Sequence, residues 1–364
     1  MIGKVICDLA PSPENNRNSE GAFVTLKDGR ILFVYSRYNN EGGDDGAAAD
    51  LYGMLSSDNG ESFSEPFPVL TRERMNAENI MSVSFMRMAN DDIGMFFLVK
   101  RDADQCLCYL TRSADEGLSW GEPVLCTQEK GYFVVNNDRI IRLRSGRLLV
   151  PAALHEAESD NINGVKRLRK LHPGKLYIFC SDDDGFTWRM LAGDISLPVN
   201  RHCSSGVQEP GLMELEDGRI WCWIRTDYGR QYQTFSIDGG ESWSPMEPSQ
   251  FTSAVSPLSM KRLADGRLLA LWNPIPLYNG RQQHYAGAWT GARTPLVYAL
   301  SSDDGETFGE LHPVETQEDH GYCYTAVHPL DDGSVLLGYC AGGPEDGSTL
   351  FRLRIRKLYP EDLC

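Results

Sequence analysis

Short apolar stretches separated by polar turns run along the whole chain and predict an all-β protein. The recurring unit is an Asp-Gly turn followed by an apolar strand, a strong signal for a β-hairpin because such turns need positive φ at their central positions. Six copies, one of them degenerate, lie at residues 28–32, 92–96, 145–149, 217–221, 265–269 and 332–336. Helical periodicity is scarce. Only residues 156–171 could hold a helix, and a long loop over one face is the favoured interpretation.

A second motif, Ser-x-Asp-x-Gly-x-x-aromatic, recurs between these hairpins and is called the box below. Its Asp can accept hydrogen bonds from backbone N–H groups just ahead, its Gly supplies positive φ, and its aromatic side chain anchors the turn in the core. The five boxes are centred on Asp58, Asp115, Asp183, Asp238 and Asp303. Intervals of 57, 68, 55 and 65 residues between these aspartates are long enough for four short strands each.

The interleaved hairpins and boxes predict one domain over residues 1–364, a six-bladed β-propeller with four-stranded antiparallel blades. No linker or low-complexity tract interrupts the series. The last unit lacks a fourth strand, and residues 4–8 alternate as a strand would. We therefore expect the N-terminal strand to complete the last blade and close the ring, which would remove exposed sheet edges.

The charge balance narrows the classes of partner. With 35 Lys and Arg against 51 Asp and Glu, the net charge is −16, which disfavours nucleic acid and anionic membranes. No apolar run approaches the ~20 residues of a spanning helix. The first residues lack a secretory signal, so a full-length chain would be cytoplasmic, whereas a trimmed secreted chain would look the same. The ten cysteines contain no Cys-x-x-Cys pair, which predicts reduced structural thiols, no metal and no other cofactor.

Boxes repeated around a six-bladed propeller resemble the Asp-box repeats of the sialidase (neuraminidase) superfamily, and the resemblance covers essentially the whole chain. It implies an exo-acting glycoside hydrolase that removes a terminal acidic sugar, such as sialic acid, from an oligosaccharide or small molecule. Sialidases are similar to one another in using three arginines for the substrate carboxylate, a Tyr nucleophile partnered by Glu, and an Asp acid/base. A tyrosine nucleophile is an exception among glycosidases, most of which use two carboxylates.

The resemblance assigns these roles to particular residues. Tyr324 matches the nucleophile, with Tyr322 as its near neighbour, and Glu209 in a Glu-Pro strand matches its base. The arginines are Arg37, Arg225 and Arg293. In the loop after Arg37, Asp50 matches a strand-leading Asp of the family, which leaves Asp44 or Asp45 as the acid/base.

One position departs from the family pattern. Glu20 stands where the first arginine is expected, and Arg17, three residues upstream, is a candidate substitute. A carboxylate at this position would repel a substrate carboxylate and would instead pair with arginines or bind a sugar hydroxyl. The sequence therefore leaves the identity of the sugar open.

Further polar residues at equivalent strand ends are expected at the same mouth. Asn137, Asp138 and Arg139 are the strongest additional substrate contacts, with Arg101 as another, and a network of structural hydrogen bonds is the competing interpretation. An inverting hydrolase using Glu20 and Asp138 is a variant of the enzyme hypothesis. The alternative from another class is a non-catalytic propeller that binds carbohydrate or protein, because the boxes specify only the scaffold.

Overall fold

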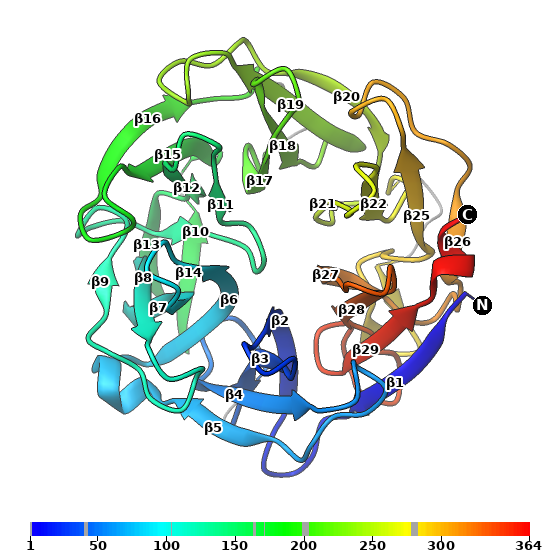
Figure 1. Ribbon diagram of the computed structural model, residues 1–364. Coiled ribbons are helices and arrows are strands. Elements are labelled where there is room, and N and C mark those ends of the chain that lie inside the picture. Colours follow the sequence, from blue (N-terminus) through cyan, green and yellow to red (C-terminus); the bar gives the residue numbers. More distant parts are fainter. Residues whose placement is uncertain are drawn as a thin grey trace.

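The computed structural model describes residues 2–39, 43–102, 104–162, 165–170, 172–198, 204–277 and 283–364. Within them the regular structure is β-strand apart from two 3₁₀ helices, η1 (Arg72–Met75) and η2 (Pro360–Leu363). The sheets are arranged around a common centre, with β2, β6, β17, β21 and β27 among the strands nearest to it (Figure 1). The chain therefore has a propeller-like all-β fold, as the sequence predicts.

Four sheets of four or five strands are separate units in this arrangement, each of them antiparallel. With neighbouring strands named in order, the first sheet contains β1 (Lys4–Leu9), β29 (Leu353–Leu358), β28 (Val335–Cys340) and β27 (Cys323–Pro329). The second contains β10 (Phe133–Val134), β12 (Leu148–Leu154), β15 (Lys175–Ser181) and β16 (Arg189–Ile195), with β11 (Ile141–Arg142) beside β12. The third contains β17 (Gln208–Glu214), β18 (Ile220–Arg225), β19 (Arg230–Ser236) and β20 (Glu247–Thr252), and the fourth contains β21 (Ser259–Arg262), β22 (Leu268–Trp272), β25 (Leu296–Ser301) and β26 (His312–Glu315).

The strands of the first two predicted units form one eight-stranded sheet instead of two separate sheets. It contains β2 (Arg17–Thr25), β3 (Ile31–Tyr38), β4 (Ala49–Ser56), β5 (Phe67–Leu70), β6 (Asn79–Arg87), β7 (Ile93–Asp102), β8 (Gln105–Ser113) and β9 (Val124–Leu125). Ala49 of β4 pairs in parallel with Asn79 of β6, and this one pairing joins the two halves. The described residues thus give four separate blades, not the six of the sequence prediction.

The N-terminal strand lies where the sequence analysis places it. β1 pairs antiparallel with β29, and Lys4 stands opposite Lys357 at one end of the ladder. The last sheet consequently combines the two ends of the chain, and Figure 1 shows them side by side.

Each box follows the third strand of its unit and leads to the outermost strand, as between β4 and β5. In the first box, the Ser56 hydroxyl donates to Asp58 Oδ1 at 2.8 Å, and Asp58 Oδ1 accepts the Ser62 N–H at 2.9 Å. Gly60 has a φ of 82°, and its N–H donates to the Ser56 hydroxyl. The same bonds recur around Asp115, Asp183, Asp238 and Asp303. The predicted role of the box as a folding device is confirmed.

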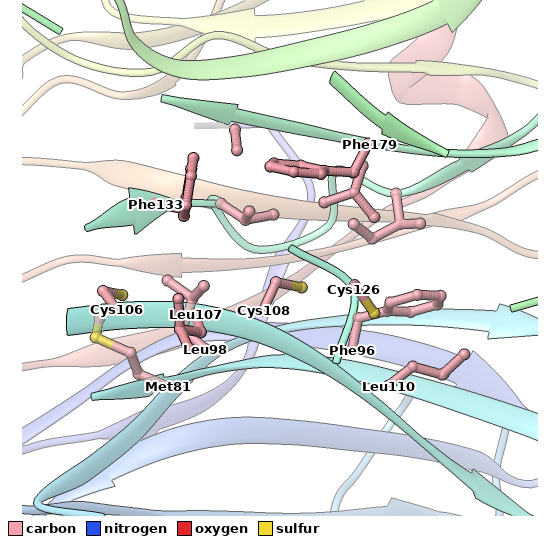
Figure 2. Close-up of a cluster of buried hydrophobic side chains, with 14 of the residues drawn as sticks. Met81, Phe96, Leu98, Cys106, Leu107, Cys108, Leu110, Cys126, Phe133 and Phe179 are labelled. Atoms are coloured by element: carbon pink, nitrogen blue, oxygen red, sulfur yellow. The ribbon is translucent and has the colours of Figure 1, made fainter. Parts of the chain in front are cut away.

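The hydrophobic core fills the spaces between neighbouring sheets. Figure 2 shows one such layer, in which Phe133 and Phe179 of the five-stranded sheet lie across from Leu98, Leu107 and other residues of the eight-stranded sheet. The two Phe rings meet edge to face with centroids 5.2 Å apart, a geometry that aromatic pairs favour. Packing of this kind holds the inner strands, and thereby their polar ends, in fixed positions.

β13 (Ala157–Ile162) pairs antiparallel with β14 (Val165–Lys170), so both the helix and the loop considered for residues 156–171 are wrong. The sequence between the strands is Asn-Gly, the most frequent dipeptide of tight hairpins, and this signal was available. A second small hairpin pairs β23 (His284–Tyr285) with β24 (Ala288–Trp289). In the part of the chain that the structure describes, no helix has the length and apolar character needed to cross a bilayer.

Candidate active site

Four inner strands carry a polar residue in the left-handed backbone conformation close to their first residues. The residues are Glu20, Ser82, Glu209 and Tyr324, with φ values of 55°, 57°, 42° and 57°. The strand register is interrupted at each of them. A bulge of this kind re-aims a side chain, and the strained conformation persists only where the surrounding structure enforces it.

These four side chains line one small cavity of about 50 Å³, together with Asp45 and Lys100. Glu20 and Tyr324 are 4% and 9% exposed. The cavity is therefore lined largely by polar groups and is assembled from residues as far apart in the sequence as Glu20 and Tyr324. Bulges and convergent polar groups of this kind are typical of functional sites.

Tyr324, Glu209 and Arg225 form the closest group within this site. The Tyr324 hydroxyl donates to Glu209 Oε1 at 3.0 Å, and Arg225 Nη1 donates to the same carboxylate oxygen at 2.6 Å and to the Tyr324 hydroxyl at 3.3 Å. Burial, followed by the charge of Glu209, raises the pKa of Tyr324 well above its usual value. The phenol is thus protonated at neutral pH and hydrogen-bonded to a base that can accept its proton.

Arg293 completes the cationic side of this group. Its guanidinium carbon lies 5.3 Å from the centroid of the Tyr324 ring and 4.8 Å from that of Trp289. Arg293 Nη1 donates to the Cys323 sulfur at 3.0 Å. The Nε atoms of Arg225 and Arg293 are both buried without a hydrogen-bond partner among the described residues, so each guanidinium keeps a donor available.

The other side of the cavity is held by Arg17. Its guanidinium donates to Glu20 Oε1 at 2.8 Å and to Asp45 Oδ1 at 2.7 Å. It also lies over the Tyr38 ring, 4.4 Å from the centroid. The Ser82 hydroxyl donates to the second oxygen of Glu20. Arg17 thus contacts the carboxylates of the cavity instead of pointing toward a vacant anion site.

The two acid/base candidates in the loop before β4 differ in their surroundings. Asp45 lines the cavity and is paired with Arg17. Asp44 is exposed, and its Oδ1 accepts the backbone N–H of Gly46 at 2.7 Å. Of the two, the structure brings only Asp45 to the cavity.

Several residues predicted for the site are not part of the lining of this cavity, and the same is true of Arg225 and Arg293. Arg37 stands over the Tyr52 ring at 4.5 Å from the centroid, and Asp50 accepts hydrogen bonds from the backbone and guanidinium of Arg72. Arg101 donates to the Tyr109 hydroxyl at 2.9 Å. Tyr322 is fully buried in the core beside Tyr339. None of the four is among the residues that line the cavity.

The polar run 136–139 makes hydrogen bonds within the protein. Asn137 Nδ2 donates to the carbonyls of Gly21 and Tyr324. Asp138 accepts from Lys261 at 2.7 Å and from the Val327 N–H at 3.0 Å, and Arg139 donates to the Leu258 carbonyl at 2.8 Å. Asp138 and Arg139 line a different cavity of about 390 Å³ that also contains the far ends of β17 and β21. Asp138 and Glu20, the pair considered for an inverting hydrolase, thus line different cavities.

Lys100, expected from the sequence at the same mouth together with Arg101, lines the cavity, and so does Ser82, which the sequence did not single out. The Lys100 ammonium donates to the Asp45 carbonyl at 2.6 Å and lies 5.4 Å from the centroid of the Tyr132 ring. Adjacent residues of a strand point to opposite faces, so in the Lys100-Arg101 pair only one side chain can reach the centre. Ser82 carries no such signal, since serine is common in strands. Within the described residues, no cluster of His, Cys, Asp and Glu could hold a metal ion.

The chain is similar to known proteins in family, sequence and fold. A family model described as a BNR repeat-like domain matches residues 64–337. An anhydrosialidase of Macrobdella decora is 27% identical over 248 residues, 62% of this chain and 28% of that protein. A human protein named sialidase-4 is 30% identical over 155 residues, 40% of this chain and 30% of that protein. The chain thus spans less than a third of the length of these curated relatives.

Solved structures show the same fold at low sequence identity. A sialidase from Streptococcus pneumoniae matches 100% of this chain and 71% of its own with a TM-score of 0.70 and 15% identity. A leech intramolecular trans-sialidase matches 100% of this chain and 71% of its own, with a TM-score of 0.71 and 15% identity. A Dyadobacter fermentans protein of unknown function covers 98% of this chain and 99% of its own with a TM-score of 0.71 and 17% identity.

Proposed function

The chain belongs to the family of BNR repeat-like domains, and from this premise we propose that it is a glycoside hydrolase of the sialidase type. The observation that carries the proposal is the contact of the Tyr324 hydroxyl with both Glu209 and Arg225. A phenol is a poor nucleophile at neutral pH unless a base takes its proton and nearby cations stabilise the charge. Glu209 supplies the base, and Arg225 and Arg293 supply the cations.

In the proposed reaction, Tyr324 attacks the anomeric carbon of a terminal sugar while Glu209 accepts the phenol proton. The unpaired Nε donors of Arg225 and Arg293 support binding of an acidic sugar, sialic acid or a related one, because a guanidinium can hold a carboxylate through two parallel hydrogen bonds. The substrate would be an oligosaccharide or a small glycoside. The net charge of −16 supports a reaction that involves neither nucleic acid nor a membrane surface.

The proposal includes an architecture of six blades in one domain over residues 1–364. The eight-stranded sheet would be two blades, since a single parallel pairing of Ala49 with Asn79 joins them. The antiparallel pairing of β1 with β29 supports closure of the ring by the N-terminal strand. Each blade would then present the start of its innermost strand at the same end of the central axis.

The first test compares Tyr324→Phe with the wild type on a panel of sialosides, uronides and deoxyhexosides. We expect the wild type to release free sugar from an acidic glycoside and Tyr324→Phe to lower kcat at least ~10³-fold, since it removes the nucleophile. The matched control is Tyr35→Phe, because Tyr35 is a buried tyrosine of β3 outside the cavity. Unchanged turnover in Tyr324→Phe would refute the assignment. Tight binding of a glycan without any product would instead favour a non-catalytic binding propeller.

A further inference from the structure

Two carboxylates of the cavity share one guanidinium. Arg17 Nη2 donates to Glu20 Oε1, and Arg17 Nη1 donates to Asp45 Oδ1, at 2.8 and 2.7 Å. A single positive charge balances one ionised carboxylate fully. When like charges share a cation in this way, the second carboxylate is driven toward its protonated form.

The surroundings decide which of the two keeps the proton. The Asp45 side chain is 60% exposed, whereas that of Glu20 is 5% exposed. Burial raises the pKa of Glu20 from its usual value, against the opposing charge of Arg17. For Asp45, the charges of Arg17 and Lys100 outweigh desolvation and lower the pKa. Two carboxylates whose environments push their pKa values apart are a frequent basis for acid and base roles in one site.

The other groups near Glu20 include one hydroxyl and two further carboxylates. The Ser82 hydroxyl donates to the second oxygen and lowers the pKa of Glu20, an effect that burial and the charges of nearby carboxylates outweigh. The negative charges of Asp45 and Glu209 disfavour ionisation of Glu20. The other titratable groups whose charges interact with Glu20 are Tyr38, Cys106, Tyr324 and Cys340. Arg17 is consequently the one cation in direct contact with Glu20 among the described residues, and it is shared with Asp45.

We propose that Glu20, and neither Asp44 nor Asp45, is the acid/base residue of the glycosidase reaction. Glu20 lines the same cavity as Tyr324 and Glu209, and its bulged backbone with a φ of 55° aims the carboxyl group at that cavity. Asp45 is held as an ionised partner of Arg17, so it has no proton to give. This inference rests on the proposed function, because it assigns a second role within the same reaction.

The proton path is balanced over two steps. Tyr324 bonds to the anomeric carbon as its proton moves to Glu209. The glycosidic C–O bond breaks, and the leaving oxygen takes the proton from Glu20 Oε2. Water then attacks the anomeric carbon and gives a proton to Glu20. The bond from the Tyr324 oxygen breaks, and Glu209 returns the proton to the phenol.

The test uses Glu20→Gln on two glycosides of the same sugar that differ only in the leaving group. An alkyl leaving group needs protonation, whereas an acidic nitrophenol leaves without it. We expect kcat/KM to fall ~10²–10⁴-fold on the alkyl glycoside, the usual contribution of a general acid. On the nitrophenyl glycoside the loss should stay below about tenfold, since no proton is required.

The matched variant is Asp45→Asn, which removes the competing carboxylate and leaves Glu20 alone with Arg17. The full charge of Arg17 then favours ionised Glu20, so the alkaline limb of the kcat/KM profile should move to lower pH. At pH values below this limb, the difference between the two leaving groups should remain as in the wild type. This profile also decides the question if Glu20→Gln does not fold.

Three outcomes would overturn the assignment. Equal losses on both glycosides in Glu20→Gln would show that Glu20 acts only through the structure of the cavity. A loss confined to the alkyl glycoside in Asp45→Asn that persists at pH values below the alkaline limb, where Glu20 is protonated, would identify Asp45 as the acid. An alkaline limb that does not move in Asp45→Asn would mean that Glu20 does not carry the essential proton. A wild type that cleaves no glycoside, or an active Tyr324→Phe, would instead refute the proposed function itself.

Discussion

At the scale of single residues, the site depends on a carboxylate held between a phenol and a guanidinium. Glu209 is 8% exposed, and its Oε1 accepts hydrogen bonds from the Tyr324 hydroxyl and from Arg225 Nη1. Its Oε2 is buried without a partner among the described residues. An acceptor left open in this way costs about 1–3 kcal/mol, which is a cost that a structural role alone does not explain.

Replacing this carboxylate by an amide is therefore a sharp test of its role. We expect Glu209→Gln to lower kcat/KM by ~10²–10⁴-fold, because Gln cannot accept the phenol proton. Since the charge of Glu209 contributes to the raised pKa of Tyr324, the variant should also lower the pKa of that phenol. Kinetics and a tyrosinate absorbance titration measure the two effects. Glu247→Gln, an exposed carboxylate on β20, is the control, and a full rate in Glu209→Gln would contradict the mechanism.

The sequence predicts some members of this site better than others, for physical reasons. Tyr324, Glu209 and Arg225 follow from the family resemblance, and they are in contact in the structure. Arg37 matches the same resemblance, yet its side chain lies over Tyr52. A motif gives the strand on which a residue lies, whereas the face to which its side chain points depends on the exact register, which one bulge can change.

At the scale of elements, the boxes make stability depend on pH. In the third box, Asp183 accepts hydrogen bonds from Thr187 and Ser181. These bonds, led by the Thr187 hydroxyl, lower the pKa of Asp183 to about 2 from 3.8. The pKa values of the other four box aspartates are also lowered to about 2, in each case with a box hydroxyl as the largest cause.

A carboxylate with a lowered folded-state pKa stabilises the fold above its unfolded pKa, and this contribution disappears as the pH falls through the folded value. We therefore expect the Tm of the wild type to fall between about pH 4 and pH 2. Asp183→Asn should lower the Tm at pH 6 and make the decrease below pH 4 shallower. Scanning calorimetry over this range measures both. Asp331→Asn, an exposed turn residue, serves as control, and an unchanged slope in Asp183→Asn would exclude the box as the origin of the pH dependence.

The elements themselves were largely readable from the chain. Asp-Gly turns and boxes predict each hairpin and its order, because both signals are local and act within about eight residues. The joined eight-stranded sheet was not predictable in this way, since Ala49 and Asn79 pair across a long connection. The sequence analysis did not predict the pairing of β13 with β14, although the Asn-Gly dipeptide between the two strands favours a hairpin.

At the scale of the whole molecule, a polar segment between β10 and β11 connects several sheets at the centre. Asn137 donates to the carbonyls of Gly21 on β2 and Tyr324 on β27. The backbone N–H of Arg139 donates to the hydroxyl of Ser84 on β6. The sequence favoured ligand contacts for this run and kept a hydrogen-bond network as the competitor. The structure fits the network, which joins residues more than a hundred positions apart and could not be read from local patterns.

Asp138 is the member of this connection that pairs with a charged side chain, and its removal tests whether the centre stabilises the fold. Its carboxylate accepts the Lys261 ammonium at 2.7 Å and the Val327 N–H at 3.0 Å, while its own N–H donates to the Val83 carbonyl. Asp138→Ala leaves a charged group and a backbone donor unpaired near the axis. We expect the free energy of unfolding to fall by about 3 kcal/mol, measured by urea denaturation.

Two further variants separate the ion pair from the backbone contact. Asp138→Asn keeps an acceptor for Val327 and should lose less than Asp138→Ala. Lys261→Ala should cost about 1 kcal/mol, since its side chain is 32% exposed and water can replace much of the interaction. In the double variant the losses should not add, because both substitutions remove the same contact. Strict additivity, or a loss below about 1 kcal/mol in Asp138→Ala, would show that packing between the sheets holds the centre together without this carboxylate.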